Sequence, residues 1–214
     1  MKELIINNKK CYLYEDDSKD CFIMPVDDHD LSLLDNLIKL SRNDNLHFNL
    51  LAIKIENWDN ELSPWKSEPL FKGNNFTGEA DNLIEYIKND LIVNLDYKNY
   101  YLIGYSLAGL FALCCGYHLD IFKGIGTISG SLWYKNWLEY IKNNKILCDN
   151  VYLSLGDKEA NSKNQIMSTV LDNTNKTYEI LKENCNCFME LNPGNHFVDF
   201  EIRIYKAIKW LLNE

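Results

Sequence analysis

The residues from Ile103 to Leu110, which read I-G-Y-S-L-A-G-L, form the chemically most informative stretch of this 214-residue chain. An apolar run leads into Gly104, a lone Ser106 follows, and a helix-forming segment rich in Leu, Ala, Phe and Cys extends to Tyr117. This order of strand, sharp turn, serine and helix is that of a nucleophile elbow, in which a tight turn holds the serine hydroxyl clear above a sheet. The pattern therefore predicts that Ser106 is a nucleophile.

This motif departs from the usual G-x-S-x-G in one residue, because Ala108 occupies the position of the second glycine. Alanine is the smallest side chain after glycine, so the strand and the helix can still approach each other. The first N–H groups of a helix have no partner within it, and we expect the Leu107 N–H to face a developing oxyanion. The motif alone is equally compatible with an ordinary strand-to-helix turn that carries a surface serine.

A nucleophilic serine needs a general base, and the chain contains four histidines. His29 lies in an acidic cluster, His47 lies in a strand-like alternation and is expected to face solvent, and His118 ends the helix after the serine. His196 lies in the loop N-P-G-N-H-F, between a predicted strand at 187–191 and the last predicted helix. A loop beyond the last strand is where a fold of this kind carries its base, so we predict His196 in that role.

The acid that orients the base should lie between the serine and the histidine in the chain. Residues 150–155 read as a buried strand, and Gly156-Asp157-Lys158-Glu159 follows at its carboxyl end. Glu159 stands three residues after the glycine, which gives the chain room to turn back, so it is the predicted acid. Asp157 is the alternative, and either carboxylate could instead be a solvated loop residue.

A second oxyanion donor should come from the loop after an earlier strand, here residues 21–26. That strand runs into Asp27-Asp28-His29-Asp30, so the backbone N–H of Asp28 or His29 is the candidate. The acidic cluster has two other interpretations, a weak divalent-cation site or the cap of a helix that begins near Leu31. We favour the cap, with Asp30 as the N-cap residue.

Taken together, these motifs resemble the esterase branch of the α/β-hydrolase superfamily that includes esterase D-like and enterochelin esterase-like enzymes. The matching blocks follow the family's order over most of the chain from about Cys21 onward: Asn60–Trp65, Gly104–Leu113, Ser129–Trp133, Gly156–Glu159 and Gly194–Phe197. The resemblance implies ester hydrolysis, with Ser106 as the nucleophile, His196 as the base and Glu159 or Asp157 as the acid.

The chain departs from the family pattern at positions that bear on the substrate. Enterochelin esterase-like members show Asp-Gly after the early strand, where this chain has Asp27-Asp28, and they carry an arginine where this chain has Trp58. Loss of that planar cation argues against a siderophore substrate. The glycine-rich oxyanion loop of the esterase D-like enzymes is also missing from the sequence. Thioesterase, acyltransferase and peptidase activities therefore remain alternatives, as does an inactive scaffold that binds a partner.

The composition is that of a globular enzyme that folds as one domain over residues 1–214, with 46% hydrophobic and 25% charged residues. A net charge of −9 disfavours binding to nucleic acid and to anionic membranes. The first residues turn polar too soon for a secretory signal, and no apolar segment is long enough to cross a membrane. We interpret the seven cysteines as reduced thiols and expect a cytoplasmic protein.

Strand-like and helix-like segments alternate along the chain, which predicts a mostly parallel, doubly wound sheet with helices on both faces, the α/β-hydrolase fold, without a separate lid domain. The predicted strands are 4–6, 10–15, 21–26, 46–55, 99–103, 124–128, 150–155 and 187–191. The predicted helices are 31–41, 79–95, 107–117, 132–143, 163–184 and 199–212.

Three tryptophans, Trp58, Trp65 and Trp133, lie where predicted strands end, and ligands bind at the carboxyl ends of parallel strands. With Tyr105, next to the nucleophile, they are the predicted substrate-binding residues. We expect the long loop at 56–78 and residues 129–133 to form the wall of a pocket for a small-molecule ester, although these rings could equally cover the sheet edge. The chemistry needs no metal or organic cofactor. The oligomeric state does not follow from the sequence.

Overall fold

The computed structural model describes residues 1–73 and 75–214, and its eight strands form one sheet in the order β1-β2-β4-β3-β5-β6-β7-β8. Strands β1 and β2 pair antiparallel, β2 pairs antiparallel with β4, and all further pairs are parallel. The strands are β1 (Lys2–Ile6), β2 (Lys9–Tyr14), β3 (Asp20–Val26), β4 (Asn49–Lys54), β5 (Asn99–Tyr105), β6 (Phe122–Ile128), β7 (Asn150–Gly156) and β8 (Asn186–Asn192).

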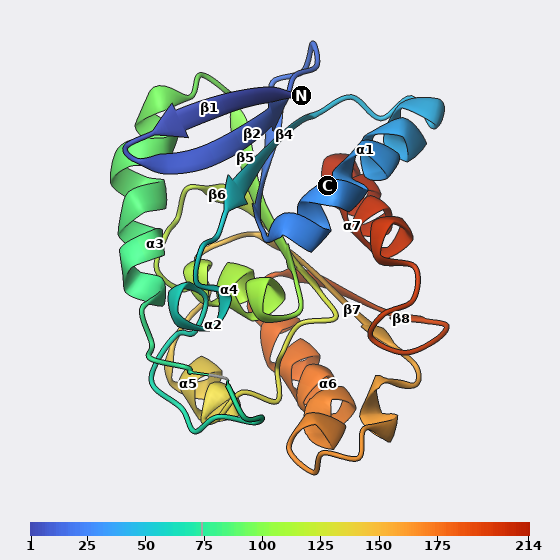
Figure 1. The fold of residues 1–214 in the computed structure, drawn as a ribbon. Helices are drawn as coiled ribbons and strands as arrows, with labels where there is room; N and C mark the ends of the chain where they lie inside the picture. Colours follow the sequence, from blue (N-terminus) through green and yellow to red (C-terminus); the bar gives the residue numbers. More distant parts are fainter. Residues whose placement is uncertain (74) are drawn as a thin grey trace.

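Helices cover both faces of this sheet (Figure 1). Helices α1 (Asp28–Asn43) and α7 (Phe200–Asn213) pack together on one face, and α3 (Ala80–Tyr86), α4 (Leu107–Cys115), α5 (Trp137–Asn143) and α6 (Val170–Leu181) lie on the other. The short helix α2 (Trp58–Glu61) lies within the predicted loop. The predicted α/β-hydrolase fold is confirmed.

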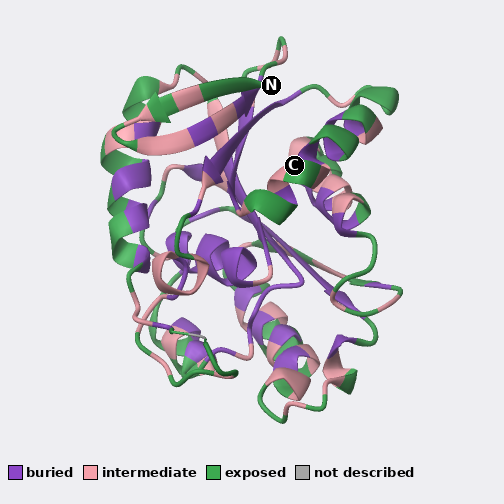
Figure 2. Ribbon diagram, viewed as in Figure 1, coloured by how far each residue is buried: buried purple, intermediate pink, exposed green. Residues whose placement is uncertain are grey.

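Two apolar cores explain this arrangement, because each face of the sheet buries its own set of side chains. One core joins β3, β5 and β7 to α3 and α4, and the other joins the opposite faces of the same strands to α1 and α7. Figure 2 shows buried residues concentrated in the central strands and on the inner sides of the helices. A sheet covered on both faces has near-continuous apolar strands, as in β5 and β7.

The predicted cap of α1 is wrong by three residues. The helix begins at Asp28, and its N-cap is Asp27, whose carboxylate accepts a hydrogen bond from the Asp30 N–H at 2.8 Å. Asp30 therefore lies inside the first turn. A side chain at the N-cap satisfies the N–H group three residues later, and Asp27 has that spacing to Asp30.

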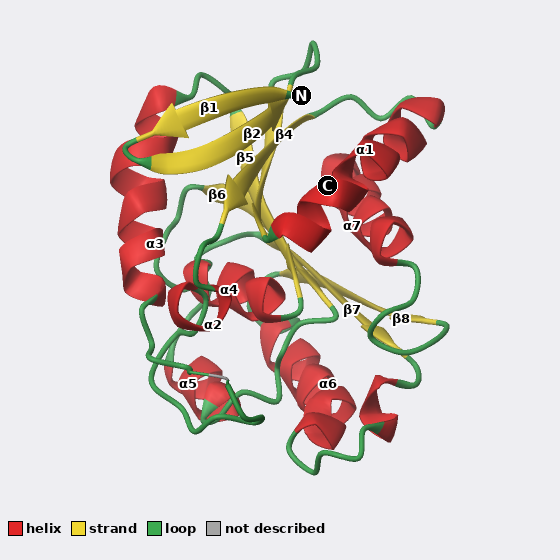
Figure 3. Cartoon of the chain, in the orientation of Figure 1, coloured by secondary structure: helices red, strands yellow, loops and turns green. Residues whose placement is uncertain are grey.

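Several predicted helices differ from their apolar pattern in type or in bounds. Figure 3 shows in red where the helices lie around the sheet. The segment predicted as one helix at 79–95 divides into α3, a π-helical turn (Ile87–Leu91) and a 3₁₀ turn (Ile92–Asn94). Helix α5 begins only at Trp137, because Asn136 adopts a left-handed conformation with φ of 63° that a helix cannot include. Helix α6 begins at Val170.

Candidate active site

Ser106 stands in the sharp turn between β5 and α4, with φ of 58° and ψ of −122°. A positive φ is uncommon for a residue with a side chain and marks a turn held by its surroundings. A Cβ atom on Gly104 would lie 2.1 Å from the carbonyl oxygen of Ala108, so the elbow requires glycine there. Ala108 itself is fully buried at the position of the second glycine. The local geometry is that of the predicted elbow.

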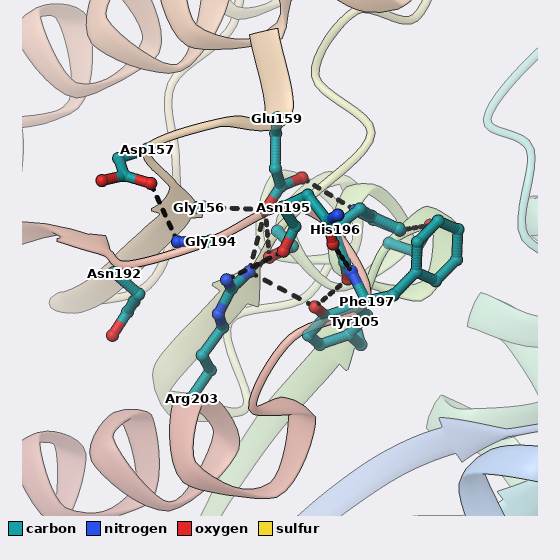
Figure 4. A network of polar contacts seen from close by, with 12 residues as sticks. Tyr105, Gly156, Asp157, Glu159, Asn192, Gly194, Asn195, His196, Phe197 and Arg203 are labelled. Carbon is teal, nitrogen blue, oxygen red and sulfur yellow. Dashed lines mark hydrogen bonds and ion pairs between the residues drawn. The ribbon is translucent and has the colours of Figure 1, made fainter. Parts of the chain in front are cut away.

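His196 lies beside the Ser106 hydroxyl, although 90 residues separate them in the chain. The imidazole Nε2 is 3.0 Å from Ser106 Oγ, and the imidazole Nδ1 is 2.7 Å from Glu159 Oε2. The serine comes from the β5–α4 turn, the histidine from the loop between β8 and α7, and Glu159 from a 3₁₀ turn (Glu159–Asn161) after β7. Figure 4 shows Glu159 and His196 facing each other. The structure thus brings together Ser106, His196 and Glu159.

The Glu159 carboxylate is buried and fully engaged, with 4% of its side chain exposed. Its Oε1 accepts hydrogen bonds from the Gly156 N–H at 2.7 Å, the Ser129 hydroxyl at 2.7 Å and the Arg203 guanidinium at 2.9 Å. Its Oε2 faces His196. Burial acts to raise the pKa of Glu159, but the hydrogen bond and charge of His196 and the hydrogen bonds from Gly156 and Ser129 hold the pKa below its ordinary value. This carboxyl is therefore ionised at neutral pH.

Arg203 on α7 joins the carboxylate to the histidine loop (Figure 4). Its side chain is fully buried, and Nη1 donates to Glu159 and to the Ser129 hydroxyl, each at 2.9 Å. Its Nη2 donates to the carbonyl oxygens of Pro193 at 3.1 Å and Asn195 at 2.9 Å. One buried cation therefore fixes both the acid and the backbone that precedes His196.

The sequence contains a signal for Arg203 in the pattern of α7. The buried positions of α7 include Phe200, Ile204, Ala207 and Ile208, which form an apolar stripe at helical spacing. Arg203 interrupts this stripe on its buried side. A charged residue at such a position requires a buried partner of opposite charge, which here is Glu159.

Asp157, the alternative acid, does not reach His196. Its Oδ1 accepts a hydrogen bond from the Gly194 N–H at 2.8 Å, and its own N–H donates to the Asn192 carbonyl oxygen at 2.8 Å. The carboxylate thereby holds the start of the histidine loop against the end of β7. Figure 4 shows Asp157 directed toward Gly194 and away from the imidazole.

Among the described residues, none of the other three histidines has a hydrogen bond to the Ser106 hydroxyl. The exposed His47 contacts Asp16 at 3.0 Å, and His118 Nε2 lies 3.1 Å from the Tyr140 hydroxyl. His29 lies on the wall of a cavity that Ser106 also lines.

Two cavities flank Ser106 and His196. The larger has a volume of about 430 Å³ and is lined by the turn at the start of α1, by Trp58, Tyr105 and Phe197, and by the start of α7. The smaller has a volume of about 60 Å³ and is lined by Ser131, Trp133, Met167 and Val170. Of the predicted substrate-binding residues, Trp58 and Tyr105 therefore lie in the larger cavity and Trp133 in the smaller.

Trp65 lines neither of these cavities. Its ring N–H donates to the carbonyl oxygen of Lys135 at 2.8 Å, and its ring packs on Tyr134 and Tyr140. The Tyr134 hydroxyl in turn donates to the Trp65 carbonyl oxygen. Trp65 therefore joins the loop at 56–78, of which residue 74 lies outside the described residues, to the segment after β6.

The acidic turn at the start of α1 lies beside the nucleophile, and Asp27 and Asp30 line the larger cavity. The Asp28 side chain is 89% exposed and pairs with Lys54 at 2.5 Å. Its N–H belongs to the first turn of α1 and has no acceptor four residues earlier in that helix. The charge of Asp28 is thus directed to a lysine, while its backbone remains in the turn beside the site.

Within residues 1–73 and 75–214, no group of three or more His, Cys, Asp or Glu side chains is arranged to hold a metal ion. In the same part of the chain, no helix has the length and apolar character to cross a membrane.

A curated Bacillus subtilis (strain 168) protein with the name Uncharacterized protein YbbA is 28% identical over 180 residues, which cover 76% of this chain and 72% of that protein. No protein-family model matches the chain.

Solved structures share the fold over nearly the whole chain. An IroE-like serine hydrolase from Shewanella oneidensis is 15% identical, with a TM-score of 0.80 over 99% of this chain and 79% of its own. The siderophore hydrolase EstA from Aspergillus nidulans is 15% identical, with a TM-score of 0.76 over 96% and 90%. The enterobactin esterase FES from Shigella flexneri is 16% identical, with a TM-score of 0.71 over 99% and 58%. At these identities the likeness establishes the fold, and it agrees with the resemblance found in the motifs.

Proposed function

We propose that this chain is a serine hydrolase that cleaves a carboxylic ester through an acyl-enzyme intermediate. The observation that carries the proposal is the continuous series of contacts from Ser106 Oγ to His196 Nε2 at 3.0 Å and from His196 Nδ1 to Glu159 Oε2 at 2.7 Å. A nucleophile, a base and an orienting acid in this order are the parts of a hydrolytic triad. The structural neighbours include a serine hydrolase, a siderophore hydrolase and an enterobactin esterase, which support the same reaction class.

In the first half-reaction, Ser106 Oγ forms a bond to the ester carbonyl carbon while His196 Nε2 takes the hydroxyl proton. The carbonyl oxygen becomes an oxyanion. We propose that it accepts hydrogen bonds from the Leu107 N–H and from a backbone N–H of Asp28 or His29. Each donor of this kind contributes about 3–4 kcal/mol to the transition state. Glu159, ionised because its pKa is lowered, stabilises the imidazolium that forms.

The intermediate then collapses, the bond to the alcohol oxygen breaks, and His196 donates its proton to that leaving oxygen. Water enters, gives a proton to His196 and attacks the acyl carbon, and the acid is released as Ser106 recovers its proton. The balance is one ester and one water in, and one acid and one alcohol out. Arg203 touches no reacting atom in this scheme and acts as a positioning residue for Glu159 and for the His196 loop.

Labelling with a fluorophosphonate, which reacts with activated serines, tests the proposal directly. The wild-type protein is expected to be labelled, whereas Ser106→Ala and His196→Ala are not. Folded wild-type protein that resists labelling would overturn the proposal and favour an inactive scaffold.

A screen with short p-nitrophenyl esters, matched thioesters and amides then identifies the reaction class. Ester hydrolysis that exceeds thioester and amide hydrolysis supports an esterase. Faster thioester or amide cleavage would assign the same site to a thioesterase or a peptidase. Product analysis with added alcohols detects acyl transfer.

We also propose that the partner of this site is a small molecule and that the protein works in the cytoplasm. The cavity volumes suit a small ligand. The seven cysteines are all free thiols, five of them buried, which is typical of a reducing compartment.

A further inference from the structure

The larger cavity at Ser106 is lined by several acidic side chains. Its lining carries four carboxyl side chains, those of Asp27, Asp30, Asp199 and Glu201. None of the described residues that line it is a lysine or an arginine. Its volume of about 430 Å³ lies within the range of about 300–1,000 Å³ that is typical of small-molecule sites. A ligand in this cavity therefore meets a negative potential beside the nucleophile.

Asp30 is the buried member of this set, whereas Asp27, Asp199 and Glu201 are half-buried or exposed. The residue is 9% exposed, and within the described chain no lysine or arginine pairs with its carboxylate and no side chain donates a hydrogen bond to it. The backbone of Asp27 is its hydrogen-bond partner. Burial, with the charge of Asp27 adding to it, raises the pKa of Asp30 to about 7, although the charges of His29 and His196 act to lower it. A buried carboxylate that faces a cavity without a lysine or an arginine is stabilised by a ligand that brings a cation.

Aromatic side chains complete the cavity. Trp58 and Tyr105 line its wall, and the exposed Phe197 stands at its edge next to His196. The faces of aromatic rings carry partial negative charge and attract ammonium groups, so rings and carboxylates together favour an organic cation over a metal ion. Trp58 occupies the position where the family resemblance places an arginine, which replaces a cation by a ring that attracts one.

The smaller cavity sets the size of the other half of the ligand. Its volume of about 60 Å³ corresponds to roughly two water molecules at about 30 Å³ each. Trp133, Met167 and Val170 line it, together with Ser129, Ser131 and Glu159. The nucleophile therefore stands between a small pocket with both apolar and polar side chains and a larger acidic pocket.

From these features we propose that the enzyme selects cationic esters, with an ammonium group in the larger cavity near Asp30 and a short uncharged group in the smaller cavity. This inference rests on the proposed hydrolysis at Ser106. It differs from the anionic or catecholate substrates that an arginine at position 58 would favour.

Two pairs of isosteric esters test the selection. Acetylcholine and 3,3-dimethylbutyl acetate differ at one atom of the alcohol part, which is a charged nitrogen in the first ester and a neutral carbon in the second. Ethyl 4-(trimethylammonio)butyrate and ethyl 5,5-dimethylhexanoate differ in the same way in the acyl part. Each kcat/KM is divided by the rate constant for hydroxide hydrolysis of the same ester, because a positive charge activates an ester by itself. We expect at least about a tenfold preference for the cation in one pair, equivalent to one pK unit of interaction. Equal values in both pairs overturn the proposal.

Substitution locates the selection at Asp30. Asp30→Asn is expected to reduce the ratio of cationic to neutral kcat/KM to near one. The matched control is Asp35→Asn, which removes the same charge from an exposed position on the same helix, where Asp35 accepts a hydrogen bond from Tyr14. A ratio that falls equally in both variants would assign the preference to overall charge and overturn the role of Asp30. If Asp30→Asn fails to fold, the wild-type ratios still decide the selection.

Binding separates the failure of this inference from the failure of the proposed function. Choline and its neutral isostere 3,3-dimethylbutanol are titrated by calorimetry into Ser106→Ala, which does not depend on turnover. Tighter binding of choline by tenfold supports the acidic cavity even if no ester is hydrolysed. Ser106-dependent hydrolysis of p-nitrophenyl acetate, combined with equal binding of the two alcohols, overturns the selection and leaves the esterase proposal intact.

Discussion

The buried carboxylates on the two sides of Ser106 have opposite surroundings. On the side of β7 and β8, the Glu159 carboxylate is buried, and each of its oxygens has at least one hydrogen-bond partner. On the side of β3 and β4, the Asp30 carboxylate is also buried but faces a cavity whose described lining has no lysine or arginine. Two acidic side chains of similar burial thus have opposite pKa directions, lowered for Glu159 and raised for Asp30.

This difference suits the two roles that we propose for the two sides, catalysis on one and selection of the ligand on the other. A carboxylate with a full set of donors is fixed in one place, as an orienting acid must be. A carboxylate without a counter-charge retains interaction energy for a ligand. The first side needs rigidity, and the second needs an open volume, which the larger cavity supplies.

The largest expected effect is the loss of the base on the rigid side. His196→Ala should lower kcat/KM for a neutral p-nitrophenyl ester by at least about 10⁴-fold, because residues of a triad act as a unit. Steady-state kinetics at pH 8 measures this. A variant that retains a tenth of the wild-type activity would contradict the role of His196.

Removal of the acid should come next and distinguishes the two candidates. Glu159→Gln keeps the size of the side chain but cannot stabilise the imidazolium, so we expect kcat to fall by about 10³–10⁴-fold. Asp157→Asn retains an oxygen for the Gly194 N–H and should lower kcat by less than about tenfold. The reverse order would assign the acid to Asp157.

Loss of the Arg203 cation should cost stability as well as activity. Arg203→Met leaves the Glu159 carboxylate buried without its guanidinium, which is expected to lower the free energy of unfolding by about 3–5 kcal/mol. Arg203→Lys restores the charge but not the fork that also holds the Pro193 and Asn195 carbonyl oxygens, so it should recover stability only in part. Urea denaturation of the wild type, Arg203→Met and Arg203→Lys measures the free energy of unfolding of each protein.

A merely structural role for Arg203 would leave the pH profile unchanged. If Arg203 positions Glu159, the plot of kcat against pH should differ between Arg203→Lys and wild type, with a shift of its acidic limb. Equal profiles with equal kcat would contradict the positioning role.

On the open side, removal of a charge should increase stability, and the size of the increase depends on pH. The folded protein holds the Asp30 proton up to a pKa of about 7, whereas the ordinary value is 3.8. Between these values the folded state binds more protons than the unfolded state, so the free energy of unfolding falls as pH rises. Asp30→Asn should therefore be more stable than wild type at pH 8, by on the order of 1–4 kcal/mol.

The difference between these proteins should shrink toward zero near pH 4. Thermal unfolding at pH 4, 6 and 8 tests this. A variant that is less stable than wild type at pH 8 would show that the carboxylate is already compensated within the fold.

The smallest effects are expected at the tryptophans. Trp58→Ala should raise KM for the preferred ester by roughly three- to tenfold, because the ring lines the larger cavity while the reacting groups remain. Trp65→Phe, outside both cavities, should leave KM within about twofold. A change in KM at Trp65 that exceeds the change at Trp58 would place the substrate elsewhere.

Local patterns were sufficient for the elements that depend on sequence neighbours. The elbow followed from Gly104 and Ser106, because a tight turn leaves few residue types that fit. Helix starts were less predictable. The N-cap of α1 is Asp27, and several acidic residues in a row offered more than one cap. The start of α5 depends on the left-handed backbone of Asn136, which no apolar period reveals.

The amino-acid sequence by itself determined the alternation of strands and helices, and with it the edge of the sheet where Ser106, His196 and a carboxylate had to lie, because parallel strands end on the same side. Only the tertiary structure showed which carboxylate contacts the imidazole, since Asp157 turns to the Gly194 N–H and Glu159 to His196. It also decided the burial of Arg203, and it placed the buried Asp30 beside a cavity whose described lining has no lysine or arginine. The energy of a charge depends on which groups surround it in space, and distant parts of the chain supply those groups.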